Sequence, residues 1–137
     1  MEVGFFTASL DRLAAWAQNA SSVGMPLSLG CCPCELGAVR TGMPVCFNPR
    51  RSDVLIVAGA IGWKAAPVIR RIYDMMPSPK SVVGVGLCAL NGGLFADSYA
   101  VVAKLSDIVP VDCYVKGCPP TVADFAAALA ELKSKGK

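Results

Sequence analysis

The sequence predicts a single α/β domain, residues 1–137, built on a doubly wound and mostly parallel sheet. Mostly apolar segments, typical of strands buried on both faces, occupy residues 53–58, 81–86 and 108–112. A segment with helical spacing follows each run, and strands that alternate with helices indicate parallel pairing. A chain of 137 residues can also bury one sizeable core without help from disulfides.

Residues 1–30 are expected to form an N-terminal helix and an interface loop. An amphipathic helix is predicted over residues 9–18, because its apolar residues share one face: Leu10, Leu13, Ala14 and Ala17. Residues 19–30, rich in Ser, Gly and Pro, are predicted to be a loop. A short strand is predicted over residues 44–48.

Three further helical segments follow. Residues 65–76 place Ile69, Ile72, Tyr73 and Met76 on one face, and prolines stop this helix at residues 77 and 79. A short helical stretch is expected over residues 99–104. The last helix starts at a capping-box pattern, Thr121-x-x-Asp124, and runs to a basic end.

The composition limits the classes of function. Hydrophobic residues make up 54% of the chain and charged residues only 17%, a surplus that suits a doubly covered sheet and subunit interfaces. The net charge of +3 is scattered, so we expect no nucleic-acid partner. The longest apolar run, residues 54–63, is too short to span a bilayer. The first residues lack a signal-peptide layout, which leads us to expect a reducing compartment.

Seven cysteines and no histidine narrow the chemistry. Without histidine, the chain has no His-based acid–base catalysis, no Cys–His nucleophile and no mixed Cys/His zinc site. An odd number of cysteines in a reducing compartment favours metal ligation over a disulfide framework.

Four of the cysteines occupy positions that suit an iron–sulfur cluster. Cys88 and Cys118 each follow a predicted strand, where open α/β sheets bind their ligands, and Cys31 and Cys32 precede the sheet. Four thiolates from separate loops are the usual ligands of a 4Fe-4S cluster, and the glycines beside them let backbone N–H groups reach its sulfurs. The alternative is a non-redox α/β binding module in which these cysteines are small packing residues. Four cysteines in such positions favour the cluster.

The other three cysteines are not expected to be ligands, with one ambiguity. Cys46 and Cys113 fall in or beside predicted strands and are interpreted as packing residues. Cys34 forms a Cys-x-x-Cys pair with Cys31, so spacing alone leaves two ligand pairs open, Cys31 with Cys32 or Cys31 with Cys34.

A dinucleotide fingerprint, G-x-G-x-x-A, also occurs at residues 84–89. The residues that follow it, Leu90-Asn91-Gly92-Gly93, are not expected to open a helix that could bind a pyrophosphate. We therefore do not expect nucleotide binding.

The order of motifs resembles the B subunit of complex I. This is the 20-kDa, PSST-type subunit of NADH:quinone oxidoreductase, which is related to the small subunits of nickel–iron hydrogenases. The resemblance covers nearly the whole chain and rests on these segments: Cys31-Cys32-x-x-Glu35, residues 52–59 and 66–80, Gly86-x-Cys88-Ala89-x-x-Gly92-Gly93, and residues 109–120 with Gly117-Cys118-Pro119-Pro120.

The resemblance implies a flavodoxin-like fold that binds the terminal 4Fe-4S cluster of an electron chain. It implies Cys31, Cys32, Cys88 and Cys118 as ligands, and Glu35 sets a register that favours Cys32 over Cys34. Two departures stand out: the stretch between Cys34 and Asp53 is shorter than in the family, and an Arg-Phe-Gly segment is not visible.

The resemblance also implies the function and partners. It predicts an electron-transfer subunit of a membrane-associated NADH:quinone oxidoreductase, passing electrons to quinone at the interface with a large, 49-kDa-type catalytic subunit. An upstream iron–sulfur subunit and membrane subunits are the other expected partners. The expected location is peripheral, on the cytoplasmic side of a cell membrane or the matrix side of the mitochondrial inner membrane. The alternative is the small subunit of an energy-converting nickel–iron hydrogenase or ferredoxin-oxidising complex.

Overall fold

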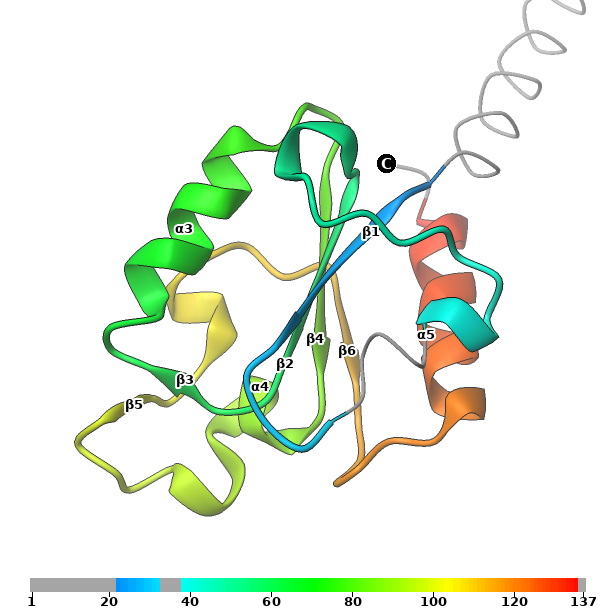
Figure 1. Ribbon diagram of the computed structural model, residues 1–137. Helices are drawn as coiled ribbons and strands as arrows, with labels where there is room; N and C mark the ends of the chain where they lie inside the picture. Colours follow the sequence, from blue (N-terminus) through cyan, green and yellow to red (C-terminus); the bar gives the residue numbers. More distant parts are fainter. Residues whose placement is uncertain (1–21, 33–37, 136–137) are drawn as a thin grey trace, which may run out of the picture.

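A four-stranded parallel sheet, covered by helices on both faces, forms the centre of the molecule (Figure 1). The computed structural model describes residues 22–32 and 38–135, so the helix predicted over residues 9–18 lies outside the described residues. Along the sheet the strands are β1 Gly24–Ser28, β2 Val54–Ala58, β4 Ser81–Val85 and β6 Cys113–Val115. Helix α3, Ala66–Met75, covers one face and α5, Val122–Ser134, covers the other. The predicted α/β fold with a doubly wound parallel sheet is confirmed.

The central strands form because their side chains are apolar on both faces. All five residues of β2 and all five of β4 are buried. Val54 and Ile56 pack in the cluster that contains the α5 residue Phe125, whereas Leu55 packs in the cluster that contains Ile69 of α3. One unbroken apolar run therefore supplies two separate cores, as strands buried on both faces do.

The loop predicted over residues 19–30 is wrong for residues 24–28, which form β1 in parallel register with β2. The glycines and proline of this segment favour a loop, but β1 accommodates Pro26 because the missing N–H is not needed for pairing with β2. The Gly24 N–H donates to Pro44 O (2.9 Å) on the side of β1 that faces away from β2. The backbone N–H groups of successive residues in a strand point to alternate sides, so the nitrogen of Pro26, two residues later, faces the same side as that of Gly24. Consequently Cys31 and Cys32 follow a strand instead of preceding the sheet.

The strand predicted over residues 44–48 is reduced to a single parallel bridge between Val45 and Gly24. The bridge cannot lengthen into a ladder past Pro26, which has no N–H to donate. With Val45 counted as the outermost position, the spatial order is Val45, β1, β2, β4, β6, which is the flavodoxin-like order. The order reverses at β1, and such a reversal opens a crevice at the carboxyl ends of the strands.

Two predictions in the second half of the chain are wrong. The strand predicted over residues 108–112 starts later, at Cys113, because Pro110 cannot donate to a ladder. Instead, the Asp112 carboxylate accepts from the Val82 N–H (2.9 Å) and so takes the place of a strand partner. The helix predicted over residues 99–104 is also absent.

In its place a second, two-stranded antiparallel sheet pairs β5, Val101–Val102, with β3, Ile61–Gly62. Short 3₁₀ helices flank β5 at Gly93–Phe95 (η2) and Leu105–Asp107 (η3), and another, η1, spans Pro49–Arg51. The β-branched pair at residues 101 and 102 favours a strand over a helix.

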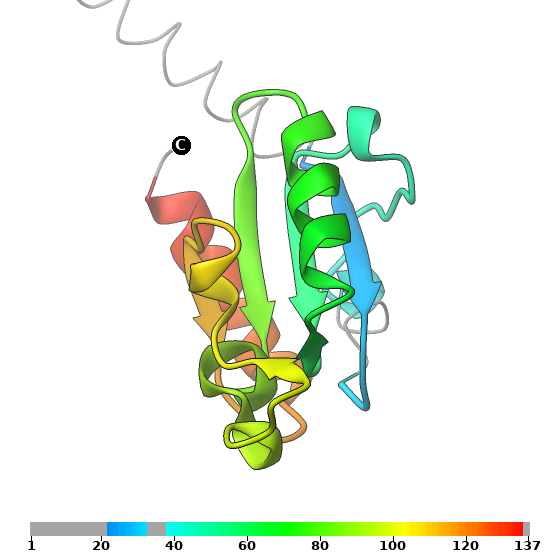
Figure 2. The ribbon, with the colours of Figure 1, turned by 90° about the vertical axis from the view of Figure 1, so that its left-hand side faces the viewer.

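The two long helices match their predictions. Helix α3 lies within one residue of the predicted range 65–76 at each end, and Thr121 caps α5 through the predicted capping box with Asp124. A short helix that was not expected, α4 Leu87–Asn91, follows β4 directly (Figure 2). Within the described residues, no helix has the length and apolar character needed to cross a membrane.

Two glycines bring the loops after β1 and β2 into backbone contact. A Cβ on Gly59 would lie 2.5 Å from the Gly30 nitrogen, and Gly59 has a φ of +97°. Only glycine combines a favourable positive φ with the absence of a Cβ that would clash with Gly30. This contact therefore sets how closely the chain before Cys31 approaches the sheet edge.

We predict that Gly59→Ala destabilises the protein more than Gly42→Ala. Gly42 has a φ of +76° with no atom within 4 Å of a Cβ, so its substitution should cost only the conformational strain, about 1–2 kcal/mol. Gly59→Ala adds overpacking, which costs about 1–3 kcal/mol more. Urea unfolding of the purified variants measures both changes in the free energy of unfolding. Equal losses would show that the Gly30–Gly59 contact is not tight.

Candidate functional site

The carboxyl edge of the sheet gathers four cysteines from three loops. Cys31 and Cys32 follow β1, Cys88 lies in α4 directly after β4, and Cys118 follows β6. Because all four main strands run in the same direction, these loops emerge at one edge, where the arrowheads in Figure 2 end and α4 begins.

Cys32 is the buried member of the group, with a side chain only 3% exposed. Its Sγ occupies the space that a side chain at Gly86 would fill: a Cβ there would lie 2.8 Å from the sulfur. Gly86 also has a φ of +86°, which favours glycine. The sequence therefore places a glycine at the end of β4 where the fold needs both a turn and room for a thiol.

The four thiols lie within electrostatic range of one another. Burial, together with the neighbouring thiols of Cys31, Cys88 and Cys118, raises the pKa of Cys32 to about 11. Burial likewise raises the pKa of Cys88, with added contributions from Cys118 and Cys31, whereas a hydrogen bond from the Leu94 backbone lowers it. In the absence of a cation the site thus opposes ionisation, because several thiolates would share a small space.

Backbone hydrogen bonds tie the Cys88 helix to the Cys118 loop. The Gly86 N–H donates to Val115 O (2.8 Å), and the Leu87 N–H donates to Gly117 O (3.1 Å). These bonds continue the β4–β6 pairing beyond the strands, so the two cysteines are held by one backbone framework.

The site is open on one side. Cys31 and Cys118 are exposed and Cys88 is intermediate, in contrast to the buried Cys32. Around the Cys88 helix, four large apolar side chains are also exposed: Leu87, Leu94, Phe95 and Tyr99. An exposed apolar surface beside exposed thiols is typical of an interaction site.

Two further cysteines lie elsewhere. Cys113 is buried at the start of β6, and its thiol donates to Ala128 O and to the Glu131 carboxylate of α5 (3.7 Å each). Cys46 pairs through its N–H with Gly24 O, at the amino end of β1. Neither contributes to the raised pKa of Cys32 or Cys88. Cys34 and Glu35 lie outside the described residues.

The described ranges, 22–32 and 38–135, contain no group of three or more cysteine or carboxylate side chains arranged to hold a metal ion. A single zinc ion, with Zn–S bonds of about 2.3 Å, would require its sulfurs within about 4 Å of one another. The four thiols interact electrostatically over a wider space than that.

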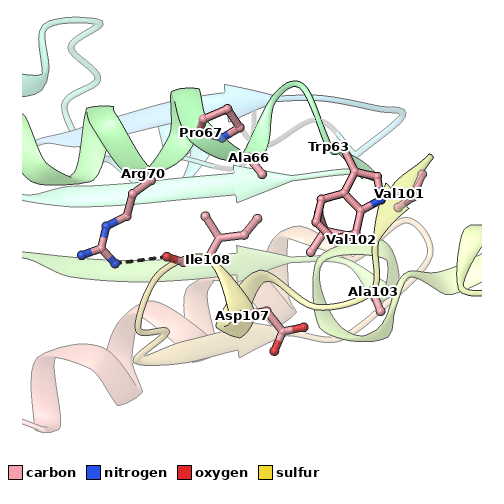
Figure 3. A pocket seen from close by; sticks show the side chains of 9 residues that line it. All are labelled: Trp63, Ala66, Pro67, Arg70, Val101, Val102, Ala103, Asp107 and Ile108. Atoms are coloured by element: carbon pink, nitrogen blue, oxygen red, sulfur yellow. Dashed lines mark hydrogen bonds between the residues drawn. The ribbon is translucent and has the colours of Figure 1, made fainter. Parts of the chain in front are cut away.

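A separate pocket of about 570 Å³ lies between α3 and β5 (Figure 3). Its walls are mostly apolar, with Trp63 at one end and Arg70 and Asp107 as charged members. Arg70 is already engaged, since its Nη1 donates to Ile108 O (3.2 Å) and its Nε pairs with Asp74 (3.4 Å). None of the four cysteines lines this pocket.

Comparison with known proteins identifies the family. Residues 18–132 match the family described as the NADH ubiquinone oxidoreductase 20 kDa subunit. The chain belongs to this family. The match spans all the strands and most of α5, and it includes the four cysteines at the carboxyl edge. The suspected relationship with the complex I subunit is confirmed.

A solved structure of a similar chain supports the assignment. It is the structure of the membrane-bound sulfane sulfur reductase, an archaeal respiratory membrane complex. One chain of that complex is 28% identical to this one, with a TM-score of 0.78 over 89% of this chain and 73% of that chain. The 20 kDa family fold is thus shared with a subunit of a respiratory complex.

The pKa of Cys32 leads to a prediction about its reactivity in metal-free protein. A thiol with a pKa of about 11 keeps its proton at pH 8, where roughly one molecule in a thousand carries the thiolate. Alkylation of Cys32 by iodoacetamide should therefore be at least about tenfold slower than that of the exposed Cys118, and should accelerate about tenfold per pH unit from pH 8 to pH 10. Peptide mass spectrometry measures both rates.

The control is the same reaction in concentrated urea, where burial is lost and the two rates should converge. Equal rates at pH 8 in the folded protein would contradict the placement of Cys32 against Gly86.

Proposed function

We propose that this chain is an electron-transfer subunit that holds one 4Fe-4S cluster on Cys31, Cys32, Cys88 and Cys118. The observation that carries the proposal is the convergence of these four thiols, from three separate loops, at the carboxyl edge of the sheet. Membership of the 20 kDa oxidoreductase family supports it.

The donor set fits a cluster better than a single ion. A cluster binds each thiolate through a different iron, so its ligands are spread wider than the sulfurs around one zinc. The glycines of the site supply the room: a Cβ on Gly86 or Gly93 would lie within about 3 Å of the Cys32 or Cys88 sulfur. Iron cations would also offset the repulsion that raises the thiol pKa values, and binding would release the protons.

When bound, the cluster supplies one-electron redox chemistry. The chain supplies the rest. Cys32 and Gly86 form a buried inner wall that excludes water, and Cys31 and Cys118 hold the outer side. Electrons would enter and leave through this outer side, where a partner can approach closely.

The partners follow from the open side of the site. We propose that a large catalytic subunit covers Cys31, Cys118 and the exposed apolar side chains near Cys88, and that an upstream iron–sulfur subunit delivers the electrons. Membrane subunits would complete the complex. The similar chain in an archaeal respiratory membrane complex supports a place in a multi-subunit membrane complex. We propose that the present chain is a peripheral subunit of such a complex, on the cytoplasmic or matrix side.

For the electron acceptor, we propose quinone at the interface with the large subunit, as in an NADH:quinone oxidoreductase. A second candidate is the small subunit of an energy-converting hydrogenase or a ferredoxin-oxidising complex. The 28% identity to a subunit of a sulfane sulfur reductase supports a respiratory membrane complex whose acceptor is not quinone. Nickel in the co-purified large subunit would indicate a hydrogenase, whereas quinone reduction by the complex without nickel would indicate the first candidate.

The ligand assignment predicts the outcome of cysteine substitutions in the co-expressed complex. Cys88→Ala and Cys118→Ala should each abolish or convert the cluster, because each removes one thiolate from a separate strand end. Cys46→Ala is the matched control and should keep the cluster. Iron and acid-labile sulfide per chain, with an anaerobic visible spectrum, give the result. An unchanged spectrum in Cys118→Ala would overturn the assignment.

The tandem pair gives a further prediction. Cys32→Ser should lose the cluster, because Cys32 supplies the buried inner thiol beside Gly86, whereas Cys34→Ser should keep it. The same iron and sulfide measurements apply to both variants. The reverse result would establish Cys31 and Cys34 as the ligand pair and would favour the hydrogenase-like candidate.

A further inference from the structure

The amino end of the sheet, opposite the edge that carries the four cysteines, presents basic and apolar side chains to solvent. The 3₁₀ helix η1, which precedes β2, lies beside α3 at this end (Figures 1 and 2). Both arginines of η1, Arg50 and Arg51, are exposed, and α3 adds the exposed Arg71 one turn before Met75. Phe47 is 69% exposed and Met75 is 43% exposed. We call these five residues the amino-end patch.

The backbone around Phe47 is fixed from inside the protein. Ser52 is fully buried, and its hydroxyl lies within hydrogen-bond distance of Cys46 O (3.1 Å) and Asn48 O (2.9 Å), the carbonyls on either side of Phe47. Asn48 then caps η1, because its Oδ1 accepts from the Arg50 N–H (3.1 Å). The exposed aromatic residue is therefore held on a fixed turn directly before the two arginines of η1, an arrangement typical of an interaction surface.

The patch arginines are not neutralised by the described part of the chain. The ion pairs found there join Arg70 to Asp74 (3.4 Å) and Lys135 to Glu131 (2.7 Å). Asp53, the acidic residue nearest to η1 in the sequence, is not paired with the patch arginines. A free guanidinium presents a planar fork of donors that fits the oxygens of a phosphate. The patch thus suits a partner that offers anionic phosphates next to an apolar layer.

We propose that the amino-end patch binds the surface of an anionic phospholipid bilayer, with its arginines on lipid phosphates and Phe47 at the boundary between headgroups and acyl chains. The inference rests on the proposed place of this chain in a membrane complex, but not on the cluster. Basic residues beside exposed apolar side chains are the features by which peripheral proteins bind such surfaces. In this orientation the carboxyl edge of the sheet faces away from the lipid, so a partner subunit can cover the cysteines.

The test is flotation of the purified full-length chain with vesicles that contain phosphatidylglycerol and with vesicles of phosphatidylcholine alone. The wild type should bind the anionic vesicles at least about tenfold more tightly, and added salt should weaken this binding by screening the charges. Arg50→Gln and Arg51→Gln together should weaken it roughly 25-fold, since each basic residue near an anionic surface contributes about fivefold. Phe47→Ser should weaken it further, whereas Phe47→Leu keeps an apolar side chain and should bind nearly as well as the wild type.

The matched control removes the same charge from the other end of the molecule. Lys64 and Lys104 are exposed and lie beside β3 and β5, away from η1. Lys64→Gln together with Lys104→Gln should therefore leave vesicle binding close to that of the wild type.

Three results would overturn the proposal. One is a wild type that does not bind anionic vesicles, and another is an equal loss of binding in the two double variants, because net charge alone would then drive the interaction. The third is an arginine double variant that binds vesicles normally but no longer co-purifies with the large subunit, which would make the patch a protein interface. Iron and acid-labile sulfide in the wild type test the proposed cluster separately, and the flotation result stands whichever way that measurement goes.

Discussion

Parallel hydrogen bonding between β1, β2, β4 and β6 is the constraint on which the rest of the structure depends. Since all four strands point the same way, the chain must return after each one, and every loop that leaves a strand leaves at the same edge. Cysteines far apart in the sequence thereby come together at this edge. The bonds from Gly86 and Leu87 to the loop after β6 extend that pairing into the site itself.

Glycine determines how close these loops can come. At Gly59 the absent side chain admits the backbone of Gly30, at Gly86 it admits the thiol of Cys32, and at Gly93 it admits the thiol of Cys88. The site is therefore shaped as much by missing side chains as by the cysteines. This explains how the thiols of Cys32 and Cys88 can lie directly against the backbone of neighbouring loops.

The parts of the fold that could be predicted from the sequence are those with a local cause. The unbroken apolar runs of β2 and β4, the spacing of α3 and the capping box at Thr121 each act over a few residues. The errors arose where a distant partner decides: Pro26 is tolerated only because its nitrogen faces away from β2, and residues 101–102 form a strand only because Ile61–Gly62 lies alongside. For the site, position after strands pointed to Cys88 and Cys118, but the space that Gly86 leaves for the Cys32 thiol depends on a contact that spacing does not reveal.

Pro26 has a consequence for how the molecule behaves among its neighbours. The outer side of β1 carries one bridge, to Val45, and then a proline where the next ladder donor would stand. A sheet edge that lacks this donor is a poor template for a strand from another molecule, and proline is one of the devices by which natural proteins blunt such edges. The edge is thus protected against aggregation by strand addition.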